Sequence, residues 1–212
     1  MGQSEKFPAL YPILDASFLP AANRAEFLRR LVRELAETGV GVLQYRNKRG
    51  DAAEVLADAR VMRAAADSQM LLILNDWPEL AVEAGFDGVH LGQTDMSPAA
   101  ARAIVGAGRI VGVSTHDEAQ LRAADLQPVD YIAIGPVFAT VTKTNPDPVV
   151  GLDGVRLARG LTKKSVVAIG GIAIENAAQV RAAGADSVAV ISAIFKPGGD
   201  AAKLAEDFFR IL

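Results

Sequence analysis

Short apolar runs alternate along the whole chain with stretches of helical spacing, and this alternation limits the fold more than any other feature. The runs are rich in Val, Ile and Leu with little polar alternation, which is typical of parallel strands covered by helices. Eight such runs occur, at residues 11–15, 40–45, 71–76, 88–91, 109–114, 131–135, 165–170 and 187–192. Helical stretches alternate with them, at about residues 23–38, 51–67, 78–84, 97–105, 117–124, 152–160, 175–183 and 200–211.

Eight strand–helix units in 212 residues predict an α/β protein, a (β/α)8 TIM barrel that forms a single domain over residues 1–212. An open doubly wound sheet rarely needs eight units, and no GxGxxG pattern follows the first run. Expected helix caps are Asp51, Ser97 and Asp117, and expected helix stops are Gly39, Gly85 and Gly184. The boundary residues therefore agree with the alternation.

Composition excludes several classes of protein. Without cysteine the chain has no disulfide, thiolate nucleophile or Cys-ligated metal cluster. The net charge is −3 and no long basic run occurs, so neither general nucleic-acid binding nor a polybasic membrane anchor is predicted. The apolar runs are far shorter than the ~20 residues that cross a bilayer, and the start MGQSEKFPAL lacks a signal-peptide core. We therefore expect a cytoplasmic protein.

Polar residues follow the apolar runs, and in barrels of this kind the C-terminal strand ends build the active site. Gln44, Arg46 and Lys48 are spaced by two, so an extended segment presents all three on one face. Lys143 follows another run. A solvated charge pair would explain Arg46 and Lys48 alone, but cations gathered from several strand ends in an acidic protein favour a polyanion.

Asp76 and Asp95 end neighbouring runs, so a barrel places them a few ångströms apart beside these cations. The two carboxylates could share a proton, neutralise the cations or bind a hard divalent cation. The neighbouring cations favour Mg²⁺ with a pyrophosphate. A helix-capping role for Asp76, just before Trp77 and Pro78, stays open.

Two further segments suit phosphate binding. Residues 135–151 form the longest stretch without periodicity and carry Thr140, Thr142 and Lys143, which predicts a functional lid that orders when ligands bind. Gly170 and Gly171, with the last strand end, stand where barrels hold an anion on backbone N–H groups and a short helix N-terminus.

The two histidines receive different interpretations. His90 lies within an apolar run and is interpreted as a core histidine without a role in the reaction. His116 follows Ser114 and Thr115 at a strand end, where it either takes part in catalysis or shapes the start of the next helix.

The ordered motifs resemble thiamine-phosphate synthase, a family related to thiazole tautomerase. They are QYRNK (44–48), ND (75–76), DGVHLGQTD (87–95), GVSTH (112–116), DYIAIGPVFATVTK (130–143), VAIGG (167–171) and VAVIS (188–192). The resemblance runs from about residue 10 to the C-terminus. It implies a (β/α)8 barrel that joins hydroxymethylpyrimidine pyrophosphate to hydroxyethylthiazole phosphate with release of pyrophosphate, by a dissociative, Mg²⁺-assisted reaction.

The resemblance also implies roles for individual residues. The catalytic set is Ser114, Lys143, Arg46 and Lys48. The substrate-binding set is Gln44, Tyr45, Arg46, Asn47, Lys48, Asn75, Ser114, Thr140, Val141, Thr142, Lys143, Gly171, Ile191 and Ser192. Asp76 and Asp95 would hold Mg²⁺. The family's pattern varies at Tyr45 and Asn47.

Two other functions suit the same fold. A thiazole tautomerase has the same fold, lacks much of the metal and pyrophosphate set and relies on a histidine, so His116 keeps that alternative open. A non-catalytic phosphate-binding sensor barrel needs only the anion sites, and the carboxylate pair argues against it. The expected partners are two small-molecule substrates, without nucleic acid or membrane, and self-association into a homo-oligomer is left open.

Overall fold

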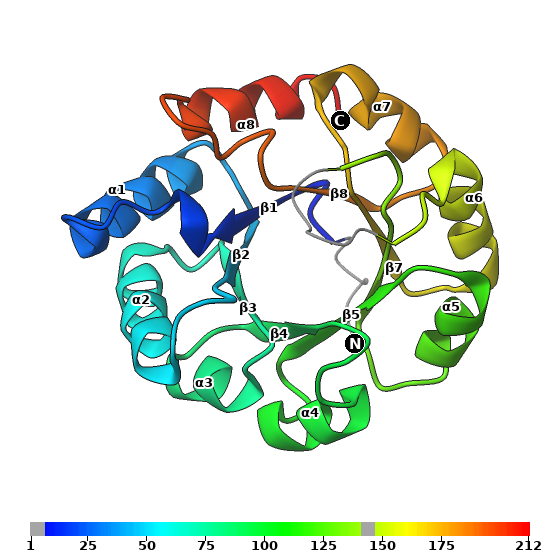
Figure 1. Cartoon of the computed structure of the whole chain (residues 1–212), viewed down its shortest axis with the longest axis horizontal. Helices are drawn as coiled ribbons and strands as arrows, with labels where there is room; N and C mark the ends of the chain where they lie inside the picture. The colour runs from blue at the N-terminus through cyan, green and yellow to red at the C-terminus, as the bar shows by residue number, and fades with distance from the viewer. Residues whose placement is uncertain (1–6, 141–146) are drawn as a thin grey trace.

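Parallel strands close into a barrel that a ring of helices surrounds (Figure 1). The computed structural model describes residues 7–140 and 147–212. In those residues the strands are β1 (Leu10–Asp15), β2 (Val42–Arg46), β3 (Leu71–Asn75), β4 (Gly88–Leu91), β5 (Ile110–Thr115), β6 (Tyr131–Ile134), β7 (Ser165–Ile169) and β8 (Ser187–Val190). Each strand pairs with the next, and β8 pairs with β1.

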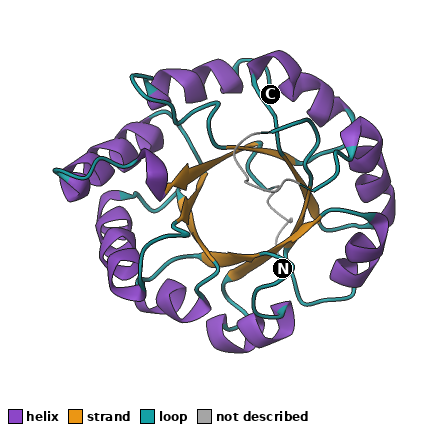
Figure 2. Cartoon of the chain, in the orientation of Figure 1, coloured by secondary structure: helices purple, strands orange, loops and turns teal. Residues whose placement is uncertain are grey.

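Helices alternate with the strands and form the outer layer (Figure 2). They are α1 (Arg24–Glu37), α2 (Ala52–Ala65), α3 (Pro78–Glu83), α4 (Pro98–Val105), α5 (Glu118–Asp125), α6 (Gly151–Leu161), α7 (Ile174–Ala182) and α8 (Ala201–Phe209). A short 3-10 helix, η1 (Ala16–Phe18), follows β1 and was not predicted. The predicted (β/α)8 TIM barrel is confirmed, with element ends shifted by a residue or two.

Local sequence accounts for the helix boundaries. The predicted caps Asp51, Ser97 and Asp117 each accept a hydrogen bond from the backbone N–H three residues later, which satisfies a donor that the helix leaves free. The chain then turns out of α1 at Gly39 and out of α7 at Gly184, both at positive φ. These boundaries follow from the sequence within a few residues of each helix end.

The strands separate two apolar cores. The outer core lies between strands and helices; α1, for example, buries Leu28, Leu31, Val32 and Leu35 along one face. The inner core fills the barrel and includes Tyr11, Ile73, Tyr131, Val167 and Ala189. Within the described residues, no helix is both long and apolar enough to cross a membrane.

The last strand is shorter than predicted. β8 ends at Val190, because the backbone N–H groups of Ile194 and Phe195 both turn back to the carbonyl oxygen of Ile191. Ile191 and Ser192 therefore lie in a turn at the barrel mouth, and the short helix expected there is replaced by this turn.

Candidate active site

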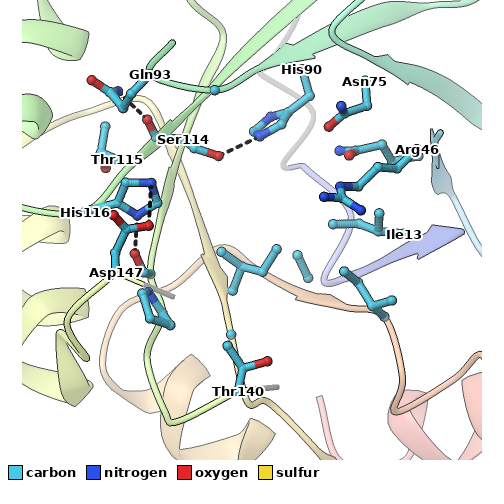
Figure 3. Close-up of a pocket in the computed structure, with 18 of the residues that line it drawn as sticks. Ile13, Arg46, Asn75, His90, Gln93, Ser114, Thr115, His116, Thr140 and Asp147 are labelled. Atoms are coloured by element: carbon cyan, nitrogen blue, oxygen red, sulfur yellow. Dashed lines mark hydrogen bonds and ion pairs between the residues drawn. The ribbon is translucent and has the colours of Figure 1, made fainter. Parts of the chain in front are cut away.

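A cavity of about 410 Å³ lies at the C-terminal ends of the strands. This volume is within the range of small-molecule sites. The predicted residues that line it are Gln44, Arg46, Lys48, Asn75, Asp76, Asp95, Ser114, Thr140, Gly171, Ile191 and Ser192. Figure 3 shows several of them around the opening, with Thr140 far from Arg46 and Asn75 in this view. Strand ends distant in sequence thus converge as predicted.

Both predicted cations on β2 and its following loop have carboxylate partners. Arg46 forms an ion pair with Asp15, which stands opposite it in the β1–β2 register. Burial opposes ionisation of Asp15, but hydrogen bonds from Ser17 and the charge and hydrogen bond of Arg46 outweigh it, so the pKa of Asp15 is lowered. Sequence reasoning missed Asp15, although it ends the first predicted strand.

Lys48 forms an ion pair with Asp76, and Asp76 also lies beside Asp95. Burial and the neighbouring carboxyl of Asp95 raise the pKa of Asp76 to about 6, against the opposing effect of Lys48. For Asp95 burial also opposes ionisation, but the hydrogen bonds from Asp76 and from the Gly92 N–H (2.7 Å) outweigh it and lower its pKa. The two carboxyls therefore titrate as a pair, and the pKa of about 6 at Asp76 belongs to the last proton of the pair when no cation lies between them.

Asp76 does not cap the following helix. The N-cap of α3 is Trp77, and no side chain makes a cap hydrogen bond there. Asp76 instead has a positive φ of 69°, and its N–H donates to the carbonyl oxygen of His90 at 2.9 Å. The backbone conformation thus places this carboxylate beside Lys48 and Asp95.

The carboxylate pair fits a hard divalent cation better than a softer one. In the described part of the chain, no group of three or more His, Cys, Asp or Glu side chains could hold a metal. Mg²⁺ commonly takes one or two carboxylates and completes its shell with waters and substrate phosphates. A cation between Asp76 and Asp95 would also offset the burial and the neighbouring carboxyl that raise the pKa of Asp76.

Asn75 offers a hydrogen-bond donor to the cavity. The residue is 7% exposed, and its Nδ2 has no hydrogen-bond partner among the described residues. Leaving a buried N–H unpaired costs about 1–3 kcal/mol. An acceptor on a ligand would remove that cost.

Ser114 meets a histidine that the sequence analysis left without a role. His90 Nε2 lies 2.8 Å from Ser114 Oγ, and the dashed line between these side chains is visible in Figure 3. Val89 and Leu91, on either side of His90 in β4, belong to the outer core. Because side chains alternate along a strand, His90 points into the barrel. That alternation was present in the sequence and could have found it.

The structure corrects the expectation for Tyr45 and Asn47, whose side chains do not line the cavity. Tyr45 is fully buried on the helix side, where its hydroxyl contacts Asp58 and accepts from Arg24. Asn47 donates to Glu54 at 2.9 Å. Residues at odd positions of this segment face away from Gln44, Arg46 and Lys48, as a two-residue period requires.

The predicted phosphate-binding rim is only partly described. Thr140 and Gly171 line the cavity, and a Cβ on Gly171 would lie 2.5 Å from the Ala139 carbonyl oxygen, so the chain packs closely there. Val141, Thr142 and Lys143 lie outside the described residues, as do residues 144–146 of the predicted lid.

His116 has contacts at both ring nitrogens. Nδ1 lies 2.5 Å from the Gly135 carbonyl oxygen, and Nε2 lies 3.3 Å from an Asp147 carboxylate oxygen. Its position at the cavity wall agrees with the sequence analysis, and both contacts hold it against the chain.

Comparison with known proteins identifies the family. A sequence model described as "Thiamine monophosphate synthase" matches residues 10–194. The chain belongs to the thiamine monophosphate synthase family. A relative from Koribacter versatilis (strain Ellin345), named thiamine-phosphate synthase, is 49% identical over 212 residues, covering 100% of this chain and 99% of its own. One from Vibrio campbellii (strain ATCC BAA-1116), with the same name, is 41% identical over 79% of this chain and 82% of its own.

A solved structure shares the fold over nearly the whole chain. Thiamine phosphate pyrophosphorylase from Pyrococcus furiosus superposes with a TM-score of 0.83 at 31% identity, covering 96% of this chain and 94% of its own. The predicted family resemblance is therefore confirmed, and it covers every strand that contributes to the cavity.

Proposed function

We propose that this protein is an enzyme of thiamine biosynthesis that joins hydroxymethylpyrimidine pyrophosphate to hydroxyethylthiazole phosphate. In the reaction, the C–O bond to pyrophosphate breaks and the leaving group keeps the electron pair. The thiazole nitrogen then donates its lone pair to the pyrimidine methylene cation, which forms the C–N bond. Membership of the family and the relatives' names support this proposal.

The observation that carries the proposal is the meeting of Lys48, Asp76 and Asp95 at one wall of the cavity, next to Arg46. A departing pyrophosphate needs cations and hydrogen-bond donors that strengthen as negative charge develops. Arg46, Lys48 and Asn75 would hold the pyrophosphate, with Lys143 joining them as the resemblance implies. No cysteine is available as a covalent nucleophile.

Asp76 and Asp95 would hold Mg²⁺, and the ion would supply charge neutralisation to the pyrophosphate when bound. Among this chain's own residues, Ser114 would donate a hydrogen bond to the leaving group, and Gln44 would orient the pyrimidine half. On the other side of the cavity, Thr140, Gly171, Ile191 and Ser192 would receive the thiazole phosphate, together with Thr142 and Val141 as the resemblance implies.

The direct test mixes both substrates with Mg²⁺ and measures thiamine phosphate and pyrophosphate. We expect both products in equal amounts, and we expect Asp95→Asn to lose most of the activity and to need more Mg²⁺. Turnover and metal dependence unchanged in Asp95→Asn would make the carboxylate pair structural. Absence of thiamine phosphate with the wild-type protein would refute the proposed reaction.

The tautomerase alternative is tested in the same assay by supplying the thiazole tautomer without the pyrimidine. That reaction needs a histidine able to move a proton, and both His116 nitrogens already have contacts with Gly135 and Asp147. Isomerisation without coupling would favour the tautomerase, and binding without turnover would favour a sensor. We further propose that the enzyme works in the cytoplasm on small molecules.

A further inference from the structure

A continuous chain of hydrogen bonds crosses the barrel interior and ends at Ser114. Gln44 Nε2 donates to the hydroxyl of Tyr11 at 2.9 Å, and that hydroxyl lies 2.9 Å from the hydroxyl of Tyr131. The Tyr131 hydroxyl lies 2.8 Å from His90 Nδ1, and His90 Nε2 lies 2.8 Å from Ser114 Oγ. The chain thus joins the inner core to a residue on the cavity wall.

The two tyrosines of this hydrogen-bond chain, Tyr11 and Tyr131, are fully buried. Burial raises the pKa of each above its ordinary value, so both remain neutral hydroxyls with one proton to donate. The neighbouring strand β5 makes room for Tyr131: Gly112 stands opposite Tyr131 in the β5–β6 register, and a Cβ on Gly112 would lie 1.9 Å from the Tyr131 ring. The barrel therefore holds the Tyr131 hydroxyl in a space that any larger residue at position 112 would invade.

The direction of the chain follows from counting protons. The Gln44 amide nitrogen only donates, so the proton of Tyr11 goes to the Tyr131 oxygen, and the proton of Tyr131 goes to His90 Nδ1. In the reverse direction the Tyr11 O–H would face the amide nitrogen without an acceptor, which costs about 1–3 kcal/mol for a buried donor. Nδ1 therefore accepts, and the proton of neutral His90 lies on Nε2.

We infer that Tyr131 and His90 are positioning residues: Tyr131 holds His90 in its Nε2–H form, His90 donates to Ser114 Oγ, and the Ser114 O–H is thereby directed into the cavity. The inference rests on the proposed function in one respect: the group that accepts the hydrogen bond from Ser114 is the departing pyrophosphate. A histidine that donates to a serine is not a base toward it. With this arrangement of protons, Ser114 can donate a hydrogen bond to a ligand, but it has no base that would activate it as a nucleophile.

The first test reads the tautomer directly. The chain has two histidines, so ¹⁵N spectra of histidine-labelled, ligand-free protein contain signals from His90 and His116 only. At about pH 8, where an ordinary imidazole is neutral, we expect a protonated Nε2 and a bare Nδ1 on His90. A proton on Nδ1 in the wild-type protein would overturn the inference without need of any variant.

Two tyrosine variants make a matched pair for the same spectra. Tyr131→Phe removes the donor to Nδ1 and should abolish the preference for the Nε2–H form. Tyr11→Phe removes the adjacent buried hydroxyl but leaves Nδ1 as the acceptor for Tyr131, so the preference should remain. Loss of the preference in Tyr11→Phe but not in Tyr131→Phe would contradict the assigned direction.

The second test measures whether Tyr131 and His90 affect the reaction through Ser114. In Tyr131→Phe we expect kcat to fall about 10- to 100-fold, less than the roughly 10²–10³-fold loss when such a donor is removed outright, with a smaller change in KM. In a Ser114→Ala background, Tyr131→Phe should cause no further loss. An equal loss in both backgrounds would overturn the inference. A wild-type protein that forms no thiamine phosphate refutes the proposed function and leaves the tautomer result intact.

Discussion

At the residue scale, Arg46 and Lys48 at the barrel mouth are each held by a carboxylate from a neighbouring strand. Arg46 is paired by Asp15 from β1, and Lys48 is paired by Asp76 from the end of β3. Such pairing fixes the orientation of long side chains that would otherwise lose conformational freedom on binding a ligand. The cations are thus preorganised for an anion that takes over part of their pairing.

Ser114→Ala tests the role of the hydroxyl. We expect kcat to fall about 10²- to 10³-fold while KM for the pyrimidine pyrophosphate changes little, because the hydrogen bond strengthens as charge develops on the leaving group. Steady-state kinetics with the pyrimidine substrate varied would measure both constants. A rise in KM with kcat unchanged would indicate ground-state anchoring, and full activity would remove Ser114 from the site.

Asp15 gives the folded protein a pH-dependent stability. Its pKa is lowered in the folded state, because hydrogen bonds from Ser17 and the charge of Arg46 outweigh burial. The folded state therefore binds this proton less readily than the unfolded chain, so the stabilisation is present above the ordinary aspartate pKa and is lost as pH falls through the lowered value.

Urea unfolding from neutral pH down to about pH 3 measures this contribution. Asp15→Asn should be less stable than wild type near neutral pH, and the difference should shrink as the pH falls. The matched control is Asp153→Asn, since Asp153 is 95% exposed and its ion pair with Arg156 is on the surface. A difference between Asp15→Asn and wild type that stays constant with pH would contradict the assignment.

At the element scale, one arrangement recurs where strands begin. Asp87, Asp130 and Asp186 each precede a strand, and each accepts the backbone N–H of a residue in the preceding strand. Arginines of α2, α4 and α6 form ion pairs with the same carboxylates. Each carboxylate therefore joins a helix to two strands at the end of the barrel opposite the cavity.

Asp130→Ala should destabilise the fold without altering the chemistry. It removes the acceptor of the Val111 N–H (2.7 Å) and the partner of Arg102, so we expect a loss of about 1–3 kcal/mol in the free energy of unfolding. Denaturant titration would measure the loss, and kcat under native conditions should stay at the wild-type value. A stability loss no larger than that of Asp153→Ala would show that the carboxylate adds little to the strand junction.

At the scale of the whole molecule, the apolar residues that stabilise the barrel and the polar residues that line the cavity lie at different levels along the barrel axis. The lower interior is filled by an apolar cluster around Tyr11 and Tyr131, while the polar residues gather at the C-terminal strand ends. A ligand that binds only the folded barrel must therefore raise the stability of all eight strand–helix units together.

Thermal unfolding with pyrophosphate and Mg²⁺ tests this coupling. With pyrophosphate at about 100 times its dissociation constant, we expect the wild-type Tm to rise by about 5–10 °C in the presence of Mg²⁺, and by less with either component alone. Asp95→Asn should lose the Mg²⁺-dependent part of the shift. Equal shifts with and without Mg²⁺ in the wild-type protein would contradict a shared metal and pyrophosphate site.

The sequence by itself determined the barrel, because its signals are local. Alternating apolar runs and helical spacing specify each element within its own residues, and Asp51, Ser97 and Asp117 form their caps three residues away. The same local period placed Gln44, Arg46 and Lys48 on one face. The same two-residue period also predicts that Tyr45 faces the helices and that His90 faces the barrel interior, as the structure shows.

Only the tertiary structure decided which side chains meet across the barrel. Tyr11 and Tyr131 are 120 residues apart and form a hydrogen bond because the barrel closes. Asp15 meets Arg46 because the β1–β2 register aligns those two residues. No local period encodes a register or a closure, since both depend on how all the strands tilt and pack together. The residues that bring chemistry to the cavity could be named from the sequence, whereas their hydrogen-bond partners required the closed barrel.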